Sequence, residues 1–292
     1  MGIICSIGKD LPGVLESLKN NRSGIGGITL LDTLHKGVLP VAEVKFRNEE
    51  LAGMCDIDGA ERHTRTTLLG LFAARQAMEN AGFRRTVKHR TGFISATTVG
   101  GMDRSENFYR QFLENRSKGR LREVVHHDCA DSTEVIANAL NIKEFVTTVS
   151  TACSSSVNSL IFGSNLIRTG RLDCVIAGGT DSINRFTLNG FNTLMILDKN
   201  GCHPFDEHRS GLTLGEGAAY LVLESEESAD RNNHDPIAEI SGYANANDAY
   251  HQTASSPDGH GAWLAMSGAV NNSGLTPGDI GYINVHGTGT LN

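Results

Sequence analysis

One cysteine of the sequence occupies a position where a thiol could act as a nucleophile. Cys153 follows the run Val149-Ser150-Thr151-Ala152, between a predicted buried strand at Phe145–Ser150 and a predicted helix at Ser154–Thr169. The N–H groups in the first turn of a helix have no partners within the helix, and the helix dipole is positive there, so a thiolate at Cys153 would be stabilised. An acyl thioester formed on its sulfur would also meet backbone donors able to hold an oxyanion.

The residues alone leave a purely structural role for Cys153 open. Free cysteines are usually small buried residues, and serines such as Ser154 are ordinary helix-capping residues. A strand-turn-helix setting recurs among nucleophiles without being restricted to them. The other cysteines lack this setting; they lie at positions 5, 55, 129, 174 and 202. With no C-x-x-C pair and no regular disulfide framework, the set is typical of a reducing compartment.

The elements around Cys153 predict a parallel α/β unit. The β-branched strand Phe145–Ser150 is followed by a helix with one apolar face and then by a second apolar strand at Cys174–Ala177. Gly170 lies where a helix C-cap belongs. Two short strands joined by one helix indicate a right-handed crossover within a parallel sheet.

The rest of the chain repeats this alternation in two closely packed regions, residues 1–230 and 236–292, with no linker rich in proline or charge between them. The first region carries the nucleophile candidate, and the second begins another α/β half. Further helices are predicted at Thr64–Ala81, Asp103–Arg122, Ser132–Leu140 and Ala262–Ser273, and further strands at Gly92–Thr97, Ala238–Tyr243 and Tyr282–Val285.

Composition disfavours several classes of function. The 292 residues are 39% hydrophobic and carry a formal net charge of −7 without a run of five like charges, so neither nucleic acid nor a membrane is an expected partner. No apolar run approaches the roughly 20 residues that span a bilayer, which favours a cytoplasmic protein. The adjacent residues His126, His127 and Asp128 rarely converge on one ion, so no metal site is expected.

Five linked motifs together resemble the beta-ketoacyl synthase family. VSTACSSS, followed after a helix by DCVIAGGTDS, is similar to the active-site signature of that family. ISATTVGGMD resembles its glycine-rich turn, and IANALNIKEFVTTVSTAC its approach to the nucleophile. HPFDEHRSGLTLGEGAAYLVLES resembles the P-F-D-x-x-R-x-G-x-x-x-G-E-G-A block, and NVHGTGT resembles the H-G-T-x-T motif. Because the motifs occur in family order along nearly the whole chain, they carry more weight than any single short pattern.

The resemblance implies a fold, a reaction and a set of site residues. The implied fold is α/β, a thiolase-like layered αβαβα arrangement with its N-terminal half nearly complete and its C-terminal half partial. The implied activity is acyl transfer followed by decarboxylative Claisen condensation of malonyl carrier protein with the acyl group. Cys153 would be the nucleophile and His286 one of two catalytic histidines. Thr288 and Thr290 would contact the pantetheine arm of the substrate, and Phe191 would lie beside the nucleophile.

The same resemblance implies the partners. These are acyl carrier protein, its acyl and malonyl thioesters, and a second copy of the chain paired along Phe145–Ser150 in a homodimer. No metal or organic cofactor is expected, because the phosphopantetheine arm belongs to the carrier protein.

The sequence also departs from the family pattern. In the family a second histidine and a lysine follow the H-G-T-x-T motif, whereas this chain ends at Asn292 and starts slightly late. We therefore expect a truncated member that is incomplete for condensation and exposes apolar edges between Ala238 and Val285.

Three other functions stay in view. One is an inert or chain-length-modulating dimerisation subunit, although such subunits lack the cysteine that this chain has at position 153. The others are a true thiolase and a synthase that uses coenzyme A substrates, which share the fold. The P-F-D, G-E-G-A and H-G-T-x-T motifs favour the carrier-protein branch over both.

Overall fold

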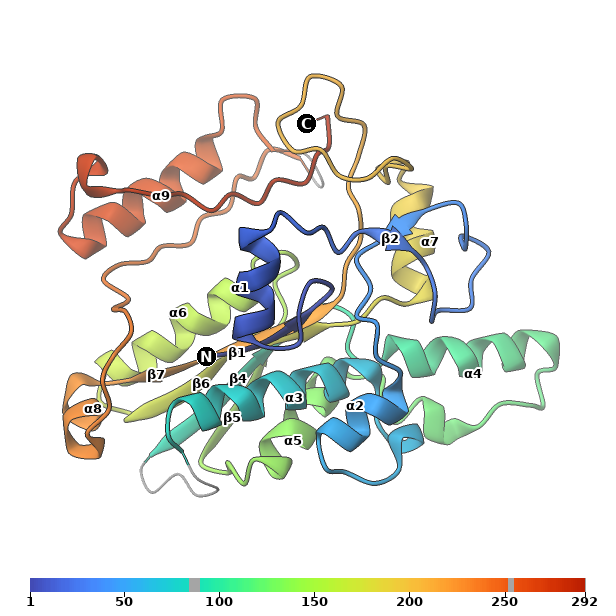
Figure 1. The fold of residues 1–292 in the computed structure, drawn as a ribbon, viewed down its shortest axis with the longest axis horizontal. Helices are drawn as coiled ribbons and strands as arrows, with labels where there is room; N and C mark the ends of the chain where they lie inside the picture. The colour runs from blue at the N-terminus through green and yellow to red at the C-terminus, as the bar shows by residue number, and fades with distance from the viewer. Residues whose placement is uncertain (84–89, 252–254, 292) are drawn as a thin grey trace.

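A five-stranded mixed sheet forms the centre of the computed structural model, which describes residues 1–83, 90–251 and 255–291 (Figure 1). The strand order is β1-β7-β6-β4-β5. β4 pairs in parallel with both β5 and β6, whereas β7 runs antiparallel to β1 and β6. The strands are β1 Gly2–Cys5, β4 Thr91–Ala96, β5 Phe145–Val149, β6 Cys174–Asp181 and β7 Gly217–Glu224, with β2 Gly26–Gly27 and β3 Pro40–Val41 in a separate pair.

Helices cover both faces of the sheet. In Figure 1, α3 and α5 lie below it and α6 lies above it. The strands alternate accordingly: Phe93 and Ile176 belong to the apolar cluster on the α3 side, and Ile94 and Val175 to the cluster on the α6 side. The helices are α1 Leu11–Lys19, α2 Asn48–Met54, α3 Arg65–Asn80, α4 Met102–Glu114, α5 Cys129–Ala139, α6 Ser155–Arg168, α7 Arg185–Thr193, α8 Glu226–Asn232 and α9 His260–Ser273.

The predicted strand-helix-strand unit around Cys153 is present as β5, α6 and β6. Its two strands are parallel, but β4 lies between them and pairs with both, so that Gly92 is opposite Phe145 on one side and Val175 on the other. Sequence patterns missed β1 and β7, which complete the sheet on its other side. The prediction also ended β6 too early, because the strand continues through two glycines to Asp181.

The prediction of one helix over Asp103–Arg122 was wrong in its second half. α4 ends at Glu114, and a short 3-10 turn follows only at Leu121–Glu123. Between them the Asn115 side chain accepts a hydrogen bond from the Ser117 N–H at 3.0 Å, and Gly119 has φ of +121°. An asparagine that bonds the backbone two residues on and a glycine outside the helical region both end a helix.

The strands predicted at Ala238–Tyr243 and Tyr282–Val285 were also wrong, whereas the predicted helix between them is present as α9. Neither segment pairs with a strand in the part of the chain that the structure describes, and an apolar pattern makes a strand only where a neighbour accepts its backbone hydrogen bonds.

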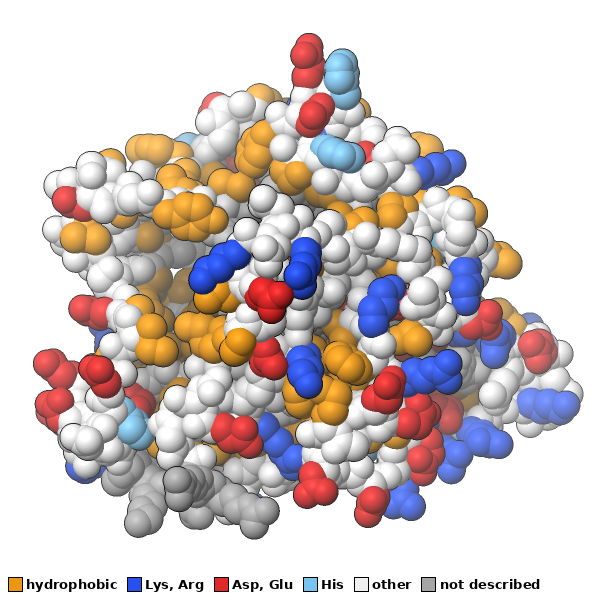
Figure 2. All heavy atoms as spheres, in the orientation of Figure 1, with side chains coloured by type: hydrophobic (Ala, Val, Ile, Leu, Met, Phe, Trp, Pro, Cys, Tyr) orange, Lys and Arg blue, Asp and Glu red, His pale blue; other side chains and the backbone are white. Residues whose placement is uncertain are grey.

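The second region exposes apolar side chains, as the sequence predicted. Ile283 is 59% exposed and Trp263 is 58% exposed. Figure 2 shows hydrophobic side chains gathered over α9 at the upper left of the molecule. The second region touches the first at α6, where the Tyr243 hydroxyl donates to the Asn165 side chain at 2.7 Å. Within the described residues, no helix is long and apolar enough to cross a bilayer.

Candidate active site

The turn from β5 into α6 holds Cys153 at the protein surface. Ala152, just before it, has φ of +54°, in the left-handed region that residues with a side chain rarely adopt. The Ser155 hydroxyl accepts a hydrogen bond from the Thr151 N–H at 2.8 Å and donates one to the Ala152 carbonyl at 2.6 Å. Backbone strain of this kind persists only where the surroundings fix it, and these two bonds contribute to fixing it at the candidate nucleophile.

Burial separates Cys153 from the other thiols. Of the six cysteines, all of which the structure describes, Cys153 alone is exposed. Burial raises the pKa of Cys55 to about 11 and also raises the pKa values of Cys129 and Cys174. Because the thiolate is the reactive form of a cysteine, those three thiols are suited to packing rather than to reaction, whereas the Cys153 side chain is open to solvent.

Gly179 lets α6 lie close to β6. A Cβ atom on Gly179 would meet the Ser156 hydroxyl at 2.3 Å and the Ala96 carbonyl at 2.9 Å. The Ser159 hydroxyl donates to the Gly178 carbonyl at 3.0 Å. The first turn of α6, which follows Cys153 directly, is therefore held against the sheet by close packing and a side-chain hydrogen bond.

The H-G-T-G-T loop rests on the P-F-D block. The Cys202 thiol donates to the Thr288 carbonyl at 3.2 Å, and Arg209 Nε donates to the Thr290 carbonyl at 2.9 Å. In Figure 1 the C-terminus correspondingly lies inside the loop that precedes β7. Two motifs separated by about eighty residues in the sequence thus form one unit, a relation that neither motif reveals by itself.

Thr288 and Thr290 line a cavity of about 330 Å³ between these two motifs. Their hydroxyl oxygens are 2.9 Å apart. The cavity is completed by Phe205, Arg209, Gly287 and Gly289. The two threonines are recognisable from the H-G-T-x-T motif, whereas Phe205 and Arg209 were not predicted as site residues, although both lie in the P-F-D motif.

The structure does not link the remaining predicted site residues. His286 is exposed at the start of the H-G-T-G-T loop, and Phe191 is half-buried on α7. Among the described residues, no hydrogen bond or ion pair joins Cys153, Phe191 and His286 to one another. Their roles, like those of the two threonines, stay predictions.

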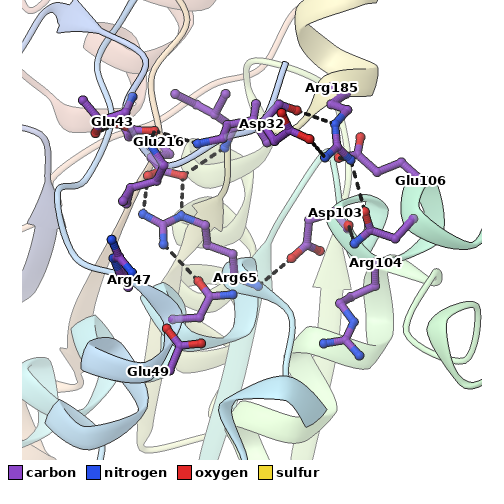
Figure 3. A pocket seen from close by; sticks show the side chains of 16 residues that line it. Asp32, Glu43, Arg47, Glu49, Arg65, Asp103, Arg104, Glu106, Arg185 and Glu216 are labelled. Atoms are coloured by element: carbon purple, nitrogen blue, oxygen red, sulfur yellow. Dashed lines mark hydrogen bonds and ion pairs between the residues drawn. The ribbon is translucent and has the colours of Figure 1, made fainter. Parts of the chain in front are cut away.

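A larger cavity of about 540 Å³ contains none of the five predicted site residues and is lined mainly by charged side chains (Figure 3). Its centre is the ion pair between Arg65 Nη2 and Glu216 Oε1 at 2.6 Å, with Arg65 Nε 2.9 Å from Glu216 Oε2. The backbone N–H groups of Val44 and Ile183 also donate to Glu216. Glu216, the glutamate of the G-E-G-A motif, therefore links the start of β7 to the start of α3, which is a structural role.

Side chains that line the same cavity also hold α7, the helix that carries Phe191. Arg185 Nη1 lies 3.2 Å from Glu106 Oε1, and the Phe186 N–H donates to Glu106 Oε2 at 3.1 Å. Figure 3 shows Arg185 and Glu106 pointing toward one another from α7 and α4. Burial raises the pKa of Glu106, while these donors oppose that rise.

Comparisons with known proteins agree on one family. The model for the beta-ketoacyl synthase N-terminal domain matches residues 1–229, and the C-terminal domain model matches residues 237–292. A 3-oxoacyl-[acyl-carrier-protein] synthase 2 of Staphylococcus aureus is 32% identical over 299 aligned residues, which cover 99% of this chain and 74% of that protein.

Two solved structures are similar along almost the whole chain. The ishigamide ketosynthase/chain length factor has a TM-score of 0.90 and 30% identity, covering 99% of this chain and 72% of that one. The ketosynthase ApeO in complex with its chain length factor ApeC from Xenorhabdus doucetiae has a TM-score of 0.81 and 28% identity, covering 99% and 71%. The mixed sheet between helices is thus the ketosynthase form of the thiolase-like fold. The chain belongs to the beta-ketoacyl synthase family.

Proposed function

We propose that the protein is a beta-ketoacyl-[acyl carrier protein] synthase, an acyltransferase that holds the growing acyl chain on Cys153. The observation that carries this proposal is the exposed thiol at a strained turn directly before α6. The name of the Staphylococcus aureus relative supports an acyl carrier protein as the substrate carrier.

In the first half reaction, the Cys153 thiolate attacks the carbonyl carbon of an acyl thioester. A new carbon–sulfur bond forms, the bond to the pantetheine sulfur breaks, and the pantetheine thiolate leaves and takes up a proton. Backbone N–H groups at the start of α6 are the donors that suit the oxyanion of the tetrahedral intermediate. The threonine-lined cavity at Thr288 and Thr290 offers hydroxyl groups to the polar pantetheine arm.

In the second half reaction, which we assign to the complete protein because these 292 residues hold only one of the two family histidines, malonyl carrier protein would lose carbon dioxide, and the resulting enolate would attack the acyl carbonyl on Cys153. The carbon–carbon bond forms as the bond to the Cys153 sulfur breaks, which restores the thiolate. His286, in its neutral form, would donate a hydrogen bond to the malonyl thioester oxygen, where enolate charge develops. Loss of one such donor typically slows the reaction by about 10²–10³-fold.

The proposed assembly is a dimer formed along β5. β5 is an edge strand, since it pairs with β4 on one side and with no other strand among the residues that the structure describes. An unpaired edge favours pairing with another chain, and a second copy related by a two-fold axis would satisfy both edges. Sedimentation velocity of the purified chain tests the dimer independently of activity.

Intact-mass spectrometry after incubation with an acyl carrier protein thioester tests the nucleophile. We expect one acyl adduct, which is absent in Cys153→Ala and retained in the matched control Cys5→Ser, since Cys5 lies on β1. A folded wild-type chain without an adduct on Cys153 would contradict the proposal and favour a noncatalytic dimerisation subunit.

Release of carbon dioxide from malonyl carrier protein tests the second half reaction. We expect His286→Ala to slow this release by about 10²-fold or more, in line with the loss of one enolate donor, while the Cys153 adduct still forms. Equal rates in the wild type and in His286→Ala would remove His286 from the proposed mechanism.

A further inference from the structure

Arg209 and Cys202 donate hydrogen bonds to main-chain carbonyls of the segment after His286, and Arg209 Nη1 also donates to the Asp206 carbonyl of its own loop at 3.1 Å. Arg209 Nε and Nη2 reach the carbonyls of Thr290 at 2.9 Å and of Leu291 at 3.4 Å. The Cys202 thiol contacts the carbonyl of Thr288 at 3.2 Å and that of Gly287 at 3.6 Å. Because every acceptor is a main-chain atom, these contacts fix the path of the backbone and do not use the threonine side chains.

Asp198 holds the loop that carries both donors. This carboxylate is 5% exposed and accepts hydrogen bonds from the Ser210 hydroxyl at 2.6 Å and from the Asn200 N–H at 2.7 Å. These bonds lower the pKa of Asp198. Backbone bonds between Asp198 and Leu212 and between Leu212 and Ile196 close the base of the same loop. The loop that carries Arg209 is therefore tied down at both ends.

Two glycines allow the H-G-T-G-T loop to lie against these donors. Gly287 and Gly289 have φ values of +54° and +72°, which glycine adopts without strain. A Cβ atom on Gly289 would meet the Gly211 carbonyl at 2.6 Å and the Cys202 sulfur at 3.0 Å. The loop consequently covers the Cys202 thiol.

We propose that Arg209, assisted by Cys202, is a positioning residue for His286. The guanidinium holds the backbone that follows His286 and so sets where the imidazole stands relative to the bound malonyl group. The Thr288 and Thr290 hydroxyls are left paired with each other at the cavity wall. This inference rests on the proposed function, because positioning matters only if His286 acts on a substrate.

The cysteines of the chain provide a test that needs no catalysis. In the purified full chain, iodoacetamide labelling of each cysteine is followed by peptide mass spectrometry in the wild type and in Arg209→Ala. We expect the labelling rate of Cys202 to rise about tenfold, because local opening of the loop uncovers its sulfur. Labelling of Cys153 should change by less than about twofold, and the buried Cys174 should stay unlabelled as a control for folding.

Arg209→Lys is the second variant, and it keeps the charge but lacks the rigid fork that places donors on two separate carbonyls. We expect its Cys202 labelling to lie between the wild type and Arg209→Ala. Arg90→Ala is the matched control, since Arg90 likewise donates to a main-chain carbonyl, that of Gly170, away from this loop. It should leave Cys202 labelling at the wild-type rate.

The rate of malonyl decarboxylation is the readout that a merely structural role would not move. We expect kcat to fall about tenfold or more in Arg209→Ala and to recover partly in Arg209→Lys, as expected when a donor is misplaced rather than removed. If the wild type shows neither decarboxylation nor an acyl adduct on Cys153, the proposed function fails, while the labelling result still decides whether Arg209 holds the loop.

Unchanged Cys202 labelling in Arg209→Ala, with Cys174 protected, would overturn the inference. If Cys174 becomes labelled in Arg209→Ala, that variant is unfolded, and Arg209→Lys then serves as the test. A wild-type labelling rate at Cys202 together with a wild-type kcat in Arg209→Lys would also overturn the inference.

Discussion

Ala152 is the residue whose backbone conformation directs the chain from β5 into the turn at Cys153. Its φ of +54° is tolerable for alanine but not for a β-branched side chain. Because Ala152 is exposed, a larger side chain there would cost free energy through backbone strain and not through clashes with buried neighbours. We expect Ala152→Val to destabilise the protein by about 1–3 kcal/mol and to slow acylation of Cys153. Urea denaturation and the rate of adduct formation measure the two effects.

Ala152→Gly is the control for that prediction, because glycine adopts the left-handed region without strain. We expect its stability to stay within about 1 kcal/mol of the wild type, since relief of strain offsets the greater freedom of the unfolded chain. Acylation should be retained. Equal acylation by the valine and glycine variants would show that the strained turn does not position the thiol.

Glu43 is the residue at which pH should affect stability most directly. Burial alone would raise its pKa, but hydrogen bonds from the Thr29 hydroxyl, the Lys45 ammonium and the N–H groups of Leu30 and Thr29 outweigh burial and lower it to about 2. The pKa in the folded protein thus lies below the ordinary value of 4.5. Stability contributed by the carboxylate is therefore complete above the ordinary value and is lost as the pH falls toward 2.

We accordingly expect Glu43→Gln to be less stable than the wild type at pH 7 by roughly 2–3 kcal/mol, with the difference shrinking between pH 5 and pH 2. Urea denaturation at several pH values measures this difference. Glu134→Gln, at an exposed position on α5, is the matched control and should differ little from the wild type throughout. A difference for Glu43→Gln that did not depend on pH would contradict the assignment.

At the scale of elements, the contact between α6 and β6 depends on Gly179. We expect Gly179→Ala to cost about 1–3 kcal/mol, because its Cβ would press on the Ser156 hydroxyl and on the Ala96 carbonyl, and the carbonyl cannot rotate away. A displaced α6 should also slow acylation of Cys153. Denaturation midpoints and adduct formation measure both consequences.

Gly190→Ala provides the comparison for Gly179→Ala. Gly190 lies inside α7, and a Cβ there would meet nothing within 4 Å. Alanine should stabilise that helix by up to about 1 kcal/mol. If both glycine variants behaved alike, close packing of α6 on β6 would not be the reason for glycine at position 179.

The elements that could be predicted from the sequence are those whose signals are local. α3, α6 and β5 follow from apolar periodicity, and their predicted ends agree with the structure within one residue. β1 and β7 were missed, because β7 is concealed within a motif noted for its glycines and because antiparallel pairing with β1 joins residues more than two hundred positions apart. The two wrong strands in the second region had the apolar pattern, but within residues 1–83, 90–251 and 255–291 neither has the paired neighbour that makes a strand.

The sequence predicts a set of site residues but not how they are arranged in space. Cys153, His286 and the two threonines could be named because each lies in a short, recognisable sequence motif. Nothing local indicated that Arg209 bonds the backbone near Thr290, since that contact depends on two loops meeting in space. The role of Glu216 was hidden for the same reason, because its partner Arg65 lies 151 residues away.

At the scale of the whole molecule, the two regions differ in how they bury apolar surface. The first region has apolar clusters on both faces of its sheet. In the second, Ile237, Ile283 and Val285 are 82%, 59% and 51% exposed, and Trp263 on α9 is 58% exposed. Grouped apolar side chains of this kind mark a surface that is covered in an assembly or promotes self-association.

This apolar surface of the second region should bind the dye ANS and make the isolated chain prone to aggregate. We expect Ile283→Asp to reduce ANS fluorescence and light scattering, because a charge interrupts the apolar surface, while stability changes by no more than about 0.5 kcal/mol at an exposed position. Leu34→Asp is the control, since Leu34 is 97% exposed in the loop between β2 and β3 and does not belong to that surface. ANS binding and scattering that fell equally in both variants would point to a general effect of added negative charge. Unchanged values in Ile283→Asp would show that the second region is already covered in solution, and sedimentation velocity would then identify the covering chain as a second copy or exclude it.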